Sequence, residues 1–141
     1  MISTVEKILF LKSIDLFSQI AGEELSQIAQ ITDETDFEAG DEIFHEGDPG
    51  STLYFIVTGR VRIHTDDEDI ALLTERQVFG EMALLDSEPR SATATAVLDV
   101  SLLKIERDDF NEILAQKSEI AQGIIKVLTR RLRTTLDRRK R

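Results

Sequence analysis

One acidic and one basic side chain, Glu81 and Arg90, lie nine residues apart in a segment rich in small residues. Residues 79–96 read Phe-Gly-Glu-Met-Ala-Leu-Leu-Asp-Ser-Glu-Pro-Arg-Ser-Ala-Thr-Ala-Thr-Ala. One glycine and four alanines in this segment are unusual for a strand, and they indicate that another group approaches the backbone closely. A helical turn that begins at Gly80 would present free N–H groups, which attract an anion.

The side chains of this segment suit a sugar phosphate. The planar guanidinium of Arg90 matches two phosphate oxygens at once, and a carboxylate such as Glu81 accepts hydrogen bonds from sugar hydroxyls. The two residues could instead form an ordinary salt bridge with each other, which would leave them without a ligand.

The elements that must position this segment follow from the hydrophobic pattern. Ser3 and Glu6 have capping-box spacing and predict an N-terminal helix that breaks near Asp15, and a second helix follows Gly22. Short β-branched and aromatic runs then predict strands at residues 42–46, 53–58, 60–65, 70–73, 94–98 and 101–106. Helical patterns return at 107 and again near 118, so the fold class is α+β.

We expect a single domain over residues 1–141, because the chain has the length of one hydrophobic core. It divides into N-terminal helices (1–34), a β-rich middle (35–106) that carries the segment 79–96, and C-terminal helices (107–141). Turn chemistry at Gly47–Gly50, a positive φ at Gly59 and an exposed acidic hairpin tip at 66–69 are predicted within the middle.

The segment 79–96 resembles the phosphate-binding cassette of the cyclic-nucleotide-binding family, which includes catabolite activator proteins, regulatory subunits of cyclic-AMP-dependent protein kinase and nucleotide-gated channels. Gly47–Gly50, Leu53–Ile56 and Gly59 match a further glycine-spaced signature, so the resemblance covers roughly 17–136. It implies an antiparallel β-roll, jelly-roll-like or double-stranded β-helix, flanked by N-terminal helices and a C-terminal lid helix. The implied function is regulatory binding of cyclic AMP or cyclic GMP without a catalytic cofactor.

The resemblance also implies roles for individual residues. Glu81 would hold the ribose 2′-hydroxyl together with Gly80, and Arg90 would hold the exocyclic phosphate oxygens. The other expected phosphate contacts are Gly80, Ala83, Ser91 and Ala92.

The base contacts expected from the resemblance lie partly in the last helix. Thr135 is the candidate that reaches the base, with Thr134 and Leu136 as alternatives in register. Ser91 permits adenine and guanine alike, so the sequence leaves the choice between cyclic AMP and cyclic GMP open.

Two departures from the family pattern stand out. Thr74–Gln77 replaces a glycine-containing turn that often precedes the cassette, and no DNA-binding helix-turn-helix follows the lid helix. We therefore expect an excised module or stand-alone adaptor, with an effector domain in a larger parent protein and with movement of the C-terminal helix as its output.

Other partners follow from charge and hydropathy. The net charge of −10 disfavours nucleic acid, although seven of the seventeen basic residues lie in the tail 130–141, which leaves a nucleic-acid contact there as an alternative. An apolar stripe over 120–136 predicts a helix that covers the ligand or forms a homodimer. Short apolar runs predict no membrane segment, and the absence of cysteine favours the cytoplasm.

Further readings compete with nucleotide binding. The same roll could serve as a ligand-free scaffold. We expect no metal site, because His45 and His64 are isolated, and no calcium site at Asp66–Asp69, which lacks the required glycine and glutamate. We expect no enzyme, because the hydroxyls of 91–95 have no neighbouring base.

Overall fold

The structure, a computed structural model, describes residues 2–81 and 88–139. They form two compact units: a roll over residues 31–111, and a helical unit made of residues 2–30 and the chain from Glu112 onward. The prediction of a single domain over the whole chain remains a prediction.

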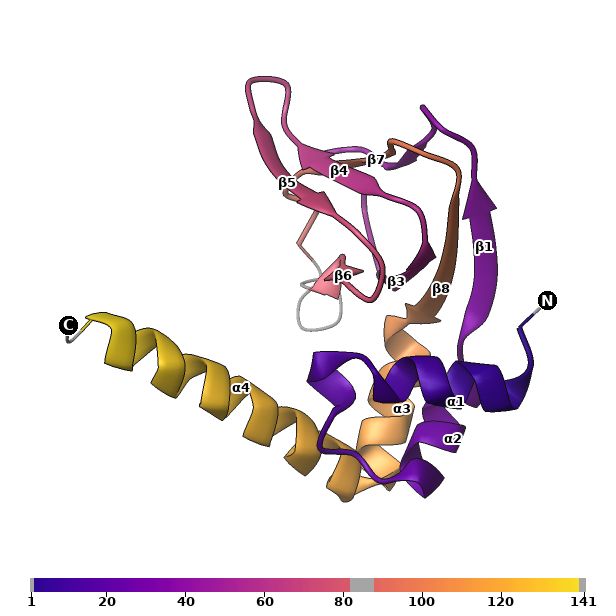
Figure 1. Ribbon diagram of the computed structural model, residues 1–141, viewed down its shortest axis with the longest axis vertical. Coiled ribbons are helices and arrows are strands. Elements are labelled where there is room, and N and C mark those ends of the chain that lie inside the picture. The colour runs from indigo at the N-terminus through magenta and orange to yellow at the C-terminus, as the bar shows by residue number, and fades with distance from the viewer. Residues whose placement is uncertain (1, 82–87, 140–141) are drawn as a thin grey trace. The chain divides into compact units, whose positions relative to one another are not determined.

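The roll consists of two four-stranded sheets in which every pairing is antiparallel (Figure 1). The first sheet has the order β1 (Asp33–Phe37), β8 (Val100–Glu106), β3 (Thr52–Thr58) and β6 (Val78–Phe79). The second has the order β2 (Glu42–Phe44), β7 (Thr93–Ala96), β4 (Val61–His64) and β5 (Asp69–Leu73). This arrangement confirms the predicted antiparallel β-roll.

Alternating side chains of the two sheets fill the interior of the roll. A buried cluster contains Ile56, Val61, Phe79, Ala94, Ala96, Val100 and Leu102, all of them at most 3% exposed. Ala94 and Ala96 on β7 belong to this cluster, so the small residues at the end of the segment 79–96 pack against the core. Their size reflects close packing inside the roll.

Two strands differ from the prediction. Neither β1 (Asp33–Phe37) nor the two-residue strand β6 (Val78–Phe79) was predicted, because the first expected strand began at residue 42 and none was expected between 73 and 94. β1 carries three acidic residues, and it is held by backbone pairing with β8 from Asp33 to Phe37. The acidic composition of β1 disfavours a strand by propensity, but the hydrogen bonds to the backbone of β8 stabilise it as one.

Two of the turns that require a left-handed backbone lie at Gly59 and Arg76. Gly59 has φ +102°, as predicted, and a Cβ there would lie 2.5 Å from the carbonyl oxygen of Asp99. Arg76 has φ +72° in the turn 74–77, and its N–H donates to the Ile56 carbonyl at 2.8 Å. A side chain in this left-handed conformation costs roughly 1–2 kcal/mol.

The helical unit begins with α1 (Thr4–Lys12), η1 (Asp15–Phe17) and α2 (Gly22–Gln30). The predicted capping box is present, because the Ser3 hydroxyl accepts from the Glu6 N–H at 3.1 Å and the Glu6 carboxylate accepts from the Ser3 N–H at 3.3 Å. α3 (Arg107–Gln116) leads from the roll into this unit, and α4 (Ser118–Arg139) follows it.

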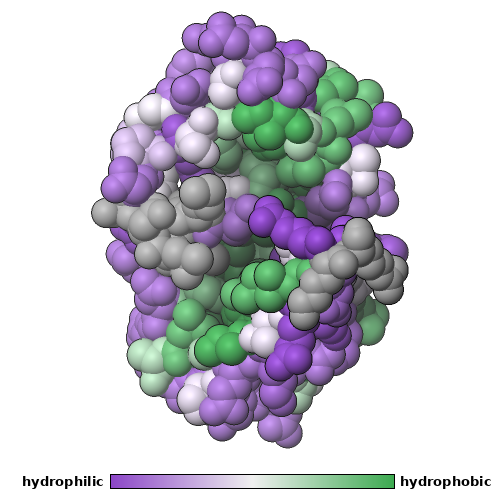
Figure 2. All heavy atoms as spheres, turned by 90° about the vertical axis from the view of Figure 1, so that its left-hand side faces the viewer, coloured by the Kyte–Doolittle hydropathy of each residue, from purple (hydrophilic) through white to green (hydrophobic). Residues whose placement is uncertain are grey.

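The predicted apolar stripe of α4 divides into two parts. Ile120 and Val127 of the stripe are buried, and so is the neighbouring Gly123, where a Cβ would lie 3.0 Å from the side chain of Ile20. Leu128, Leu132 and Leu136 of the stripe are 46–59% exposed, as is the neighbouring Ile125. Figure 2 shows apolar side chains exposed among polar ones on one face of the molecule.

Candidate functional site

A cavity of about 360 Å³ opens in the roll, next to the segment that the sequence singled out. The segment contributes Phe79, Gly80, Glu81, Glu88, Pro89, Arg90, Ser91 and Ala92 to its wall. The strands contribute Phe44, Ile63, Ala71, Leu73 and Val78, which make the rest of the wall apolar. An apolar hollow with a few polar groups at one end is typical of a small-molecule site.

Arg90 is the buried charged residue of this wall, with 9% of its surface exposed. Its Nη2 donates to the Thr52 carbonyl at 2.9 Å, and its Nη1 donates to the Gly80 carbonyl at 3.5 Å. The guanidinium lies over the ring of Phe44, 4.0 Å from the centroid, where the negative face of the ring attracts a cation. The strands therefore fix the guanidinium plane before any ligand arrives.

The guanidinium of Arg90 is incompletely satisfied. Its Nε is buried and has no hydrogen-bond partner among the described residues. Burial lowers the pKa of Arg90, and the nearby Tyr54, Glu106 and Asp48 partly oppose that shift. A buried cation with a free donor attracts an acceptor that carries negative charge.

Glycine at two positions makes room for this guanidinium. A Cβ at Gly50 would lie 2.5 Å from the guanidinium carbon, and a Cβ at Gly80 would lie 2.8 Å from Nη1. Gly80 also has φ +80°, which side chains rarely adopt. The loop before β3 and the end of β6 therefore form a slot for Arg90.

The backbone of Arg90 is bound to the predicted turn at Gly47–Gly50. The Arg90 N–H donates to the Asp48 carbonyl at 2.8 Å, and the Gly47 N–H donates to the Arg90 carbonyl at 2.8 Å. The turn thus holds the backbone of Arg90 through these bonds and leaves space for its side chain at Gly50.

Most of the predicted ligand contacts come together at the cavity. Gly80, Glu81, Arg90, Ser91 and Ala92 all line it, whereas Ala83 lies outside the described residues. The ion pairs of the described residues do not include one between Glu81 and Arg90, and Glu81 is exposed. The structure therefore does not support the simple salt-bridge interpretation.

The predicted base contacts on α4 belong to the helical unit. The hydroxyls of Thr134 and Thr135 donate to the carbonyls of Arg130 and Arg131, each at 3.0 Å, and both residues and Leu136 are exposed. Two arginines of the basic tail are engaged within the same unit, because Arg130 and Arg131 pair with Asp15 at 3.6 and 2.8 Å.

Sequence reasoning missed the residues that hold the guanidinium in place. Phe44 was assigned only to a strand, Thr52 was assigned no role, and Gly50 was assigned to a turn and to the glycine-spaced signature but not to the site. Phe44 also packs with Tyr54 and Phe79, whose rings stack at 5.0 Å. The glycine spacing around 50 was the available signal, but only the structure shows that it accommodates Arg90.

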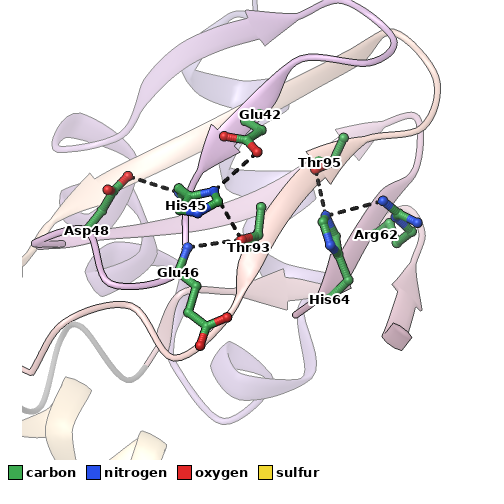
Figure 3. Close-up of polar contacts among 8 residues, drawn as sticks. All are labelled: Glu42, His45, Glu46, Asp48, Arg62, His64, Thr93 and Thr95. Atoms are coloured by element: carbon green, nitrogen blue, oxygen red, sulfur yellow. Dashed lines mark hydrogen bonds and ion pairs between the residues drawn. The ribbon is translucent and has the colours of Figure 1, made fainter. Parts of the chain in front are cut away.

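The two histidines bind neighbouring polar side chains (Figure 3). His45 Nδ1 lies 3.2 Å from a Glu42 carboxylate oxygen, and that hydrogen bond raises the pKa of His45. His64 Nε2 lies 2.8 Å from the Thr95 hydroxyl oxygen. In the part of the chain that the structure describes, no three His, Asp or Glu side chains converge in a way that could bind a metal ion.

No helix within residues 2–81 and 88–139 has the length and apolar character that crossing a membrane requires.

The family model described as "Cyclic nucleotide-binding domain" matches residues 34–117. The chain is 34% identical over 122 residues to the "CRP-like cAMP-activated global transcriptional regulator" of Mycobacterium tuberculosis, covering 81% of this chain and 54% of that protein. It is 34% identical over 113 residues to the "cAMP-dependent protein kinase regulatory subunit" of Emericella nidulans, covering 79% of this chain and 27% of that protein. The chain thus spans about half or less of these relatives.

Solved structures agree with this assignment. The N-terminal domain of a transcriptional regulator from Streptomyces coelicolor matches with a TM-score of 0.80 and 32% identity, over 91% of this chain and 93% of that chain. The catabolite activator protein of Thermus thermophilus matches with a TM-score of 0.73 and 35% identity, over 86% of this chain and 59% of that chain. By sequence and by fold, the chain belongs to the cyclic nucleotide-binding domain family.

Proposed function

We propose that this chain is a non-catalytic sensor domain that binds a cyclic nucleotide, with cyclic AMP as the preferred ligand, in the cavity beside Arg90. The observation that carries the proposal is the buried guanidinium of Arg90, whose Nε has no hydrogen-bond partner among the described residues, in a residue that lines a cavity of about 360 Å³. Sites for small ligands typically have volumes of about 300–1,000 Å³. An anionic phosphodiester supplies the charged acceptor that this donor lacks.

In the proposed complex, Arg90 binds the exocyclic phosphate oxygens, with the backbone at Gly80, Ala83, Ser91 and Ala92 around them. Glu81 is exposed and lines the same cavity, so it is available to accept a hydrogen bond from the ribose 2′-hydroxyl. The apolar wall at the far side suits the flat face of a base.

The names of relatives support cyclic AMP over cyclic GMP. The relatives from Mycobacterium tuberculosis and Emericella nidulans carry cyclic AMP in their names. A kinase regulatory subunit from Trypanosoma brucei described as cAMP-independent also matches, with a TM-score of 0.76 and 27% identity, so the titration below compares both cyclic nucleotides. Ser91 offers a hydroxyl to either base.

The proposed output is a change in the C-terminal helix, in which Thr135, with Thr134 or Leu136 as register alternatives, reaches the base. A ligand shifts a conformational equilibrium only when it binds one state more tightly, and a helix contact to the base would supply that difference. The exposed leucines of α4 are also available for a homodimer, and an effector domain in a longer parent protein would receive the signal.

The test is isothermal titration of the chain with cyclic AMP and cyclic GMP, with 5′-AMP as the control that lacks the cyclic phosphodiester. We expect saturable binding of cyclic AMP at micromolar or tighter Kd. Binding of neither cyclic ligand would refute the proposal and favour a ligand-free scaffold.

Arg90→Lys is the matched variant, with Arg60→Lys as its control. Lysine replaces a planar fork by a point charge, so we expect Arg90→Lys to lose roughly tenfold or more in affinity. Arg60 is exposed and lies outside the cavity wall, so Arg60→Lys should bind as the unmodified chain does.

A further inference from the structure

Glu106 connects the end of β8 to the loop that holds Arg90. It is the last residue of β8 and is half-buried. Its two carboxylate oxygens accept hydrogen bonds from two consecutive hydroxyls, from Ser51 at 3.0 Å and from Thr52 at 2.9 Å. A single carboxylate therefore clamps two neighbouring residues where the loop enters β3.

The clamped residues lead directly to the guanidinium. The carbonyl of Thr52 accepts from Arg90 Nη2 at 2.9 Å, and a Cβ at Gly80 would lie 2.8 Å from the same oxygen. The carbonyl of Ser51 accepts from the N–H of Arg107, which begins α3, at 2.7 Å. The position of the 51–52 backbone thus determines where Arg90 finds its acceptor.

We propose that Glu106 is a positioning residue of the anion site: it fixes Ser51 and Thr52, and the Thr52 carbonyl in turn holds the guanidinium of Arg90 in the cavity wall. The inference rests on the proposed function. The pairing of β3 with β8 continues inward through Leu53 and Ile105 to Ile56 and Leu102, so the fold does not depend on this carboxylate alone.

Charge supports the same role. Glu106 lies close enough to Arg90 to favour its charged form, and it opposes the effect that burial has on the pKa of Arg90. Its carboxylate oxygens are already occupied by the two hydroxyls, so Glu106 supports the guanidinium through the backbone and leaves Nε free.

The first arm of the test measures cyclic AMP affinity in Glu106→Ala and Glu106→Gln. Alanine removes both hydrogen bonds, and we expect the Kd to rise about three- to tenfold, as loss of one positioning bond at Arg90 implies. Glutamine keeps one carbonyl acceptor and donates to the other hydroxyl, so its Kd should stay within about twofold of that of the unmodified chain. Glu112→Ala, at an exposed glutamate of α3, is the control.

The second arm needs no ligand. In ¹H–¹⁵N spectra, the Nε–H signal of Arg90 is assigned by its absence in Arg90→Lys. We expect slow exchange of this proton with water in the unmodified chain and in Glu106→Gln, and exchange at least about threefold faster in Glu106→Ala, because a released guanidinium reaches solvent.

The outcomes separate the two proposals. If the unmodified chain binds no cyclic nucleotide, the proposed function fails, and the Nε–H exchange alone decides whether Glu106 positions Arg90. Equal affinity and equal exchange in Glu106→Ala would overturn the positioning role, and so would a glutamine variant as weak as alanine. If Glu106→Ala does not fold, Thr52→Val takes its place in both measurements, because it removes one of the two hydroxyls at nearly constant volume.

Discussion

The slot at Gly50 provides a sharp test of the site, because its effect on Arg90 follows from geometry. In Gly50→Ala the new methyl group would collide with the guanidinium, whose carbon would lie 2.5 Å away. The guanidinium is the far end of a flexible side chain, so it moves and the backbone stays. Arg90 would then lose its bond to Thr52 and its place over Phe44.

The expected magnitude follows from the hydrogen bond that the displaced guanidinium no longer makes to the phosphate. A hydrogen bond to a charged group contributes about 1.5–3 kcal/mol, which corresponds to a loss of roughly 10- to 150-fold in affinity. The fold should tolerate the change, because Gly50 does not have a positive φ. A glycine-to-alanine change at such a position typically stabilises by about 0.4–1 kcal/mol, which offsets part of the lost contacts.

Isothermal titration with cyclic AMP measures the affinity, and thermal unfolding shows whether the variant is folded. Gly22→Ala is the matched control, because no atom lies within 4 Å of a Cβ there and its φ is not positive. If Gly50 acts through Arg90, adding Gly50→Ala to Arg90→Lys should cause little further loss. An affinity within about twofold of the unmodified chain in Gly50→Ala alone would refute the reasoning.

Three further variants test other parts of the structure. Glu81→Ala should weaken cyclic AMP but leave its 2′-deoxy analogue almost unaffected in the same titration, and equal losses for both ligands would reject the ribose contact. Arg76→Gly should raise the free energy of unfolding in urea by about 0.5–1 kcal/mol, because it relieves a left-handed side chain at φ +72°; a decrease would contradict this strain. Glu42 raises the pKa of His45 above 6.5, so the stability gained from protonated His45 is complete below pH 6.5 and is lost as the pH rises through the folded pKa. Urea midpoints at pH 6 and pH 8 should therefore show Glu42→Gln as destabilised at the lower pH only, and an equal difference at both pH values would argue against this linkage.

Much of the fold followed from local signals that the sequence displays. The capping box at Ser3 and Glu6, the positive φ of Gly59 and the hairpin tip, predicted at 66–69 and found at 65–68, each depend on residues a few positions apart. Strand β1 was harder to predict because its acidic sequence is stabilised by the partner strand β8, about seventy residues later.

The charged residues of the site could be predicted from the sequence, but the residues that hold them in place could not. Arg90 and Glu81 stood out by type and by resemblance, and the structure places both on one cavity. The partners of Arg90 could not be read from the sequence, because Phe44 and the carbonyl of Thr52 reach it only through sheet pairing and loop closure. Every residue has a backbone carbonyl, so the residue type does not show which carbonyl accepts a hydrogen bond from Arg90.

The second half of α4 has a thermodynamic consequence. All residues of 128–139 are exposed, and Asp15 ties this stretch down only near its start, through Arg130 and Arg131. Helical stability in proteins comes mostly from packing of an apolar face, so we expect these exposed turns to unwind more readily than the packed first half of α4. A partner that buries Leu132 and Leu136 would therefore also stabilise the last turns of the helix. Amide hydrogen exchange along α4 would then report, turn by turn, whether that partner is bound.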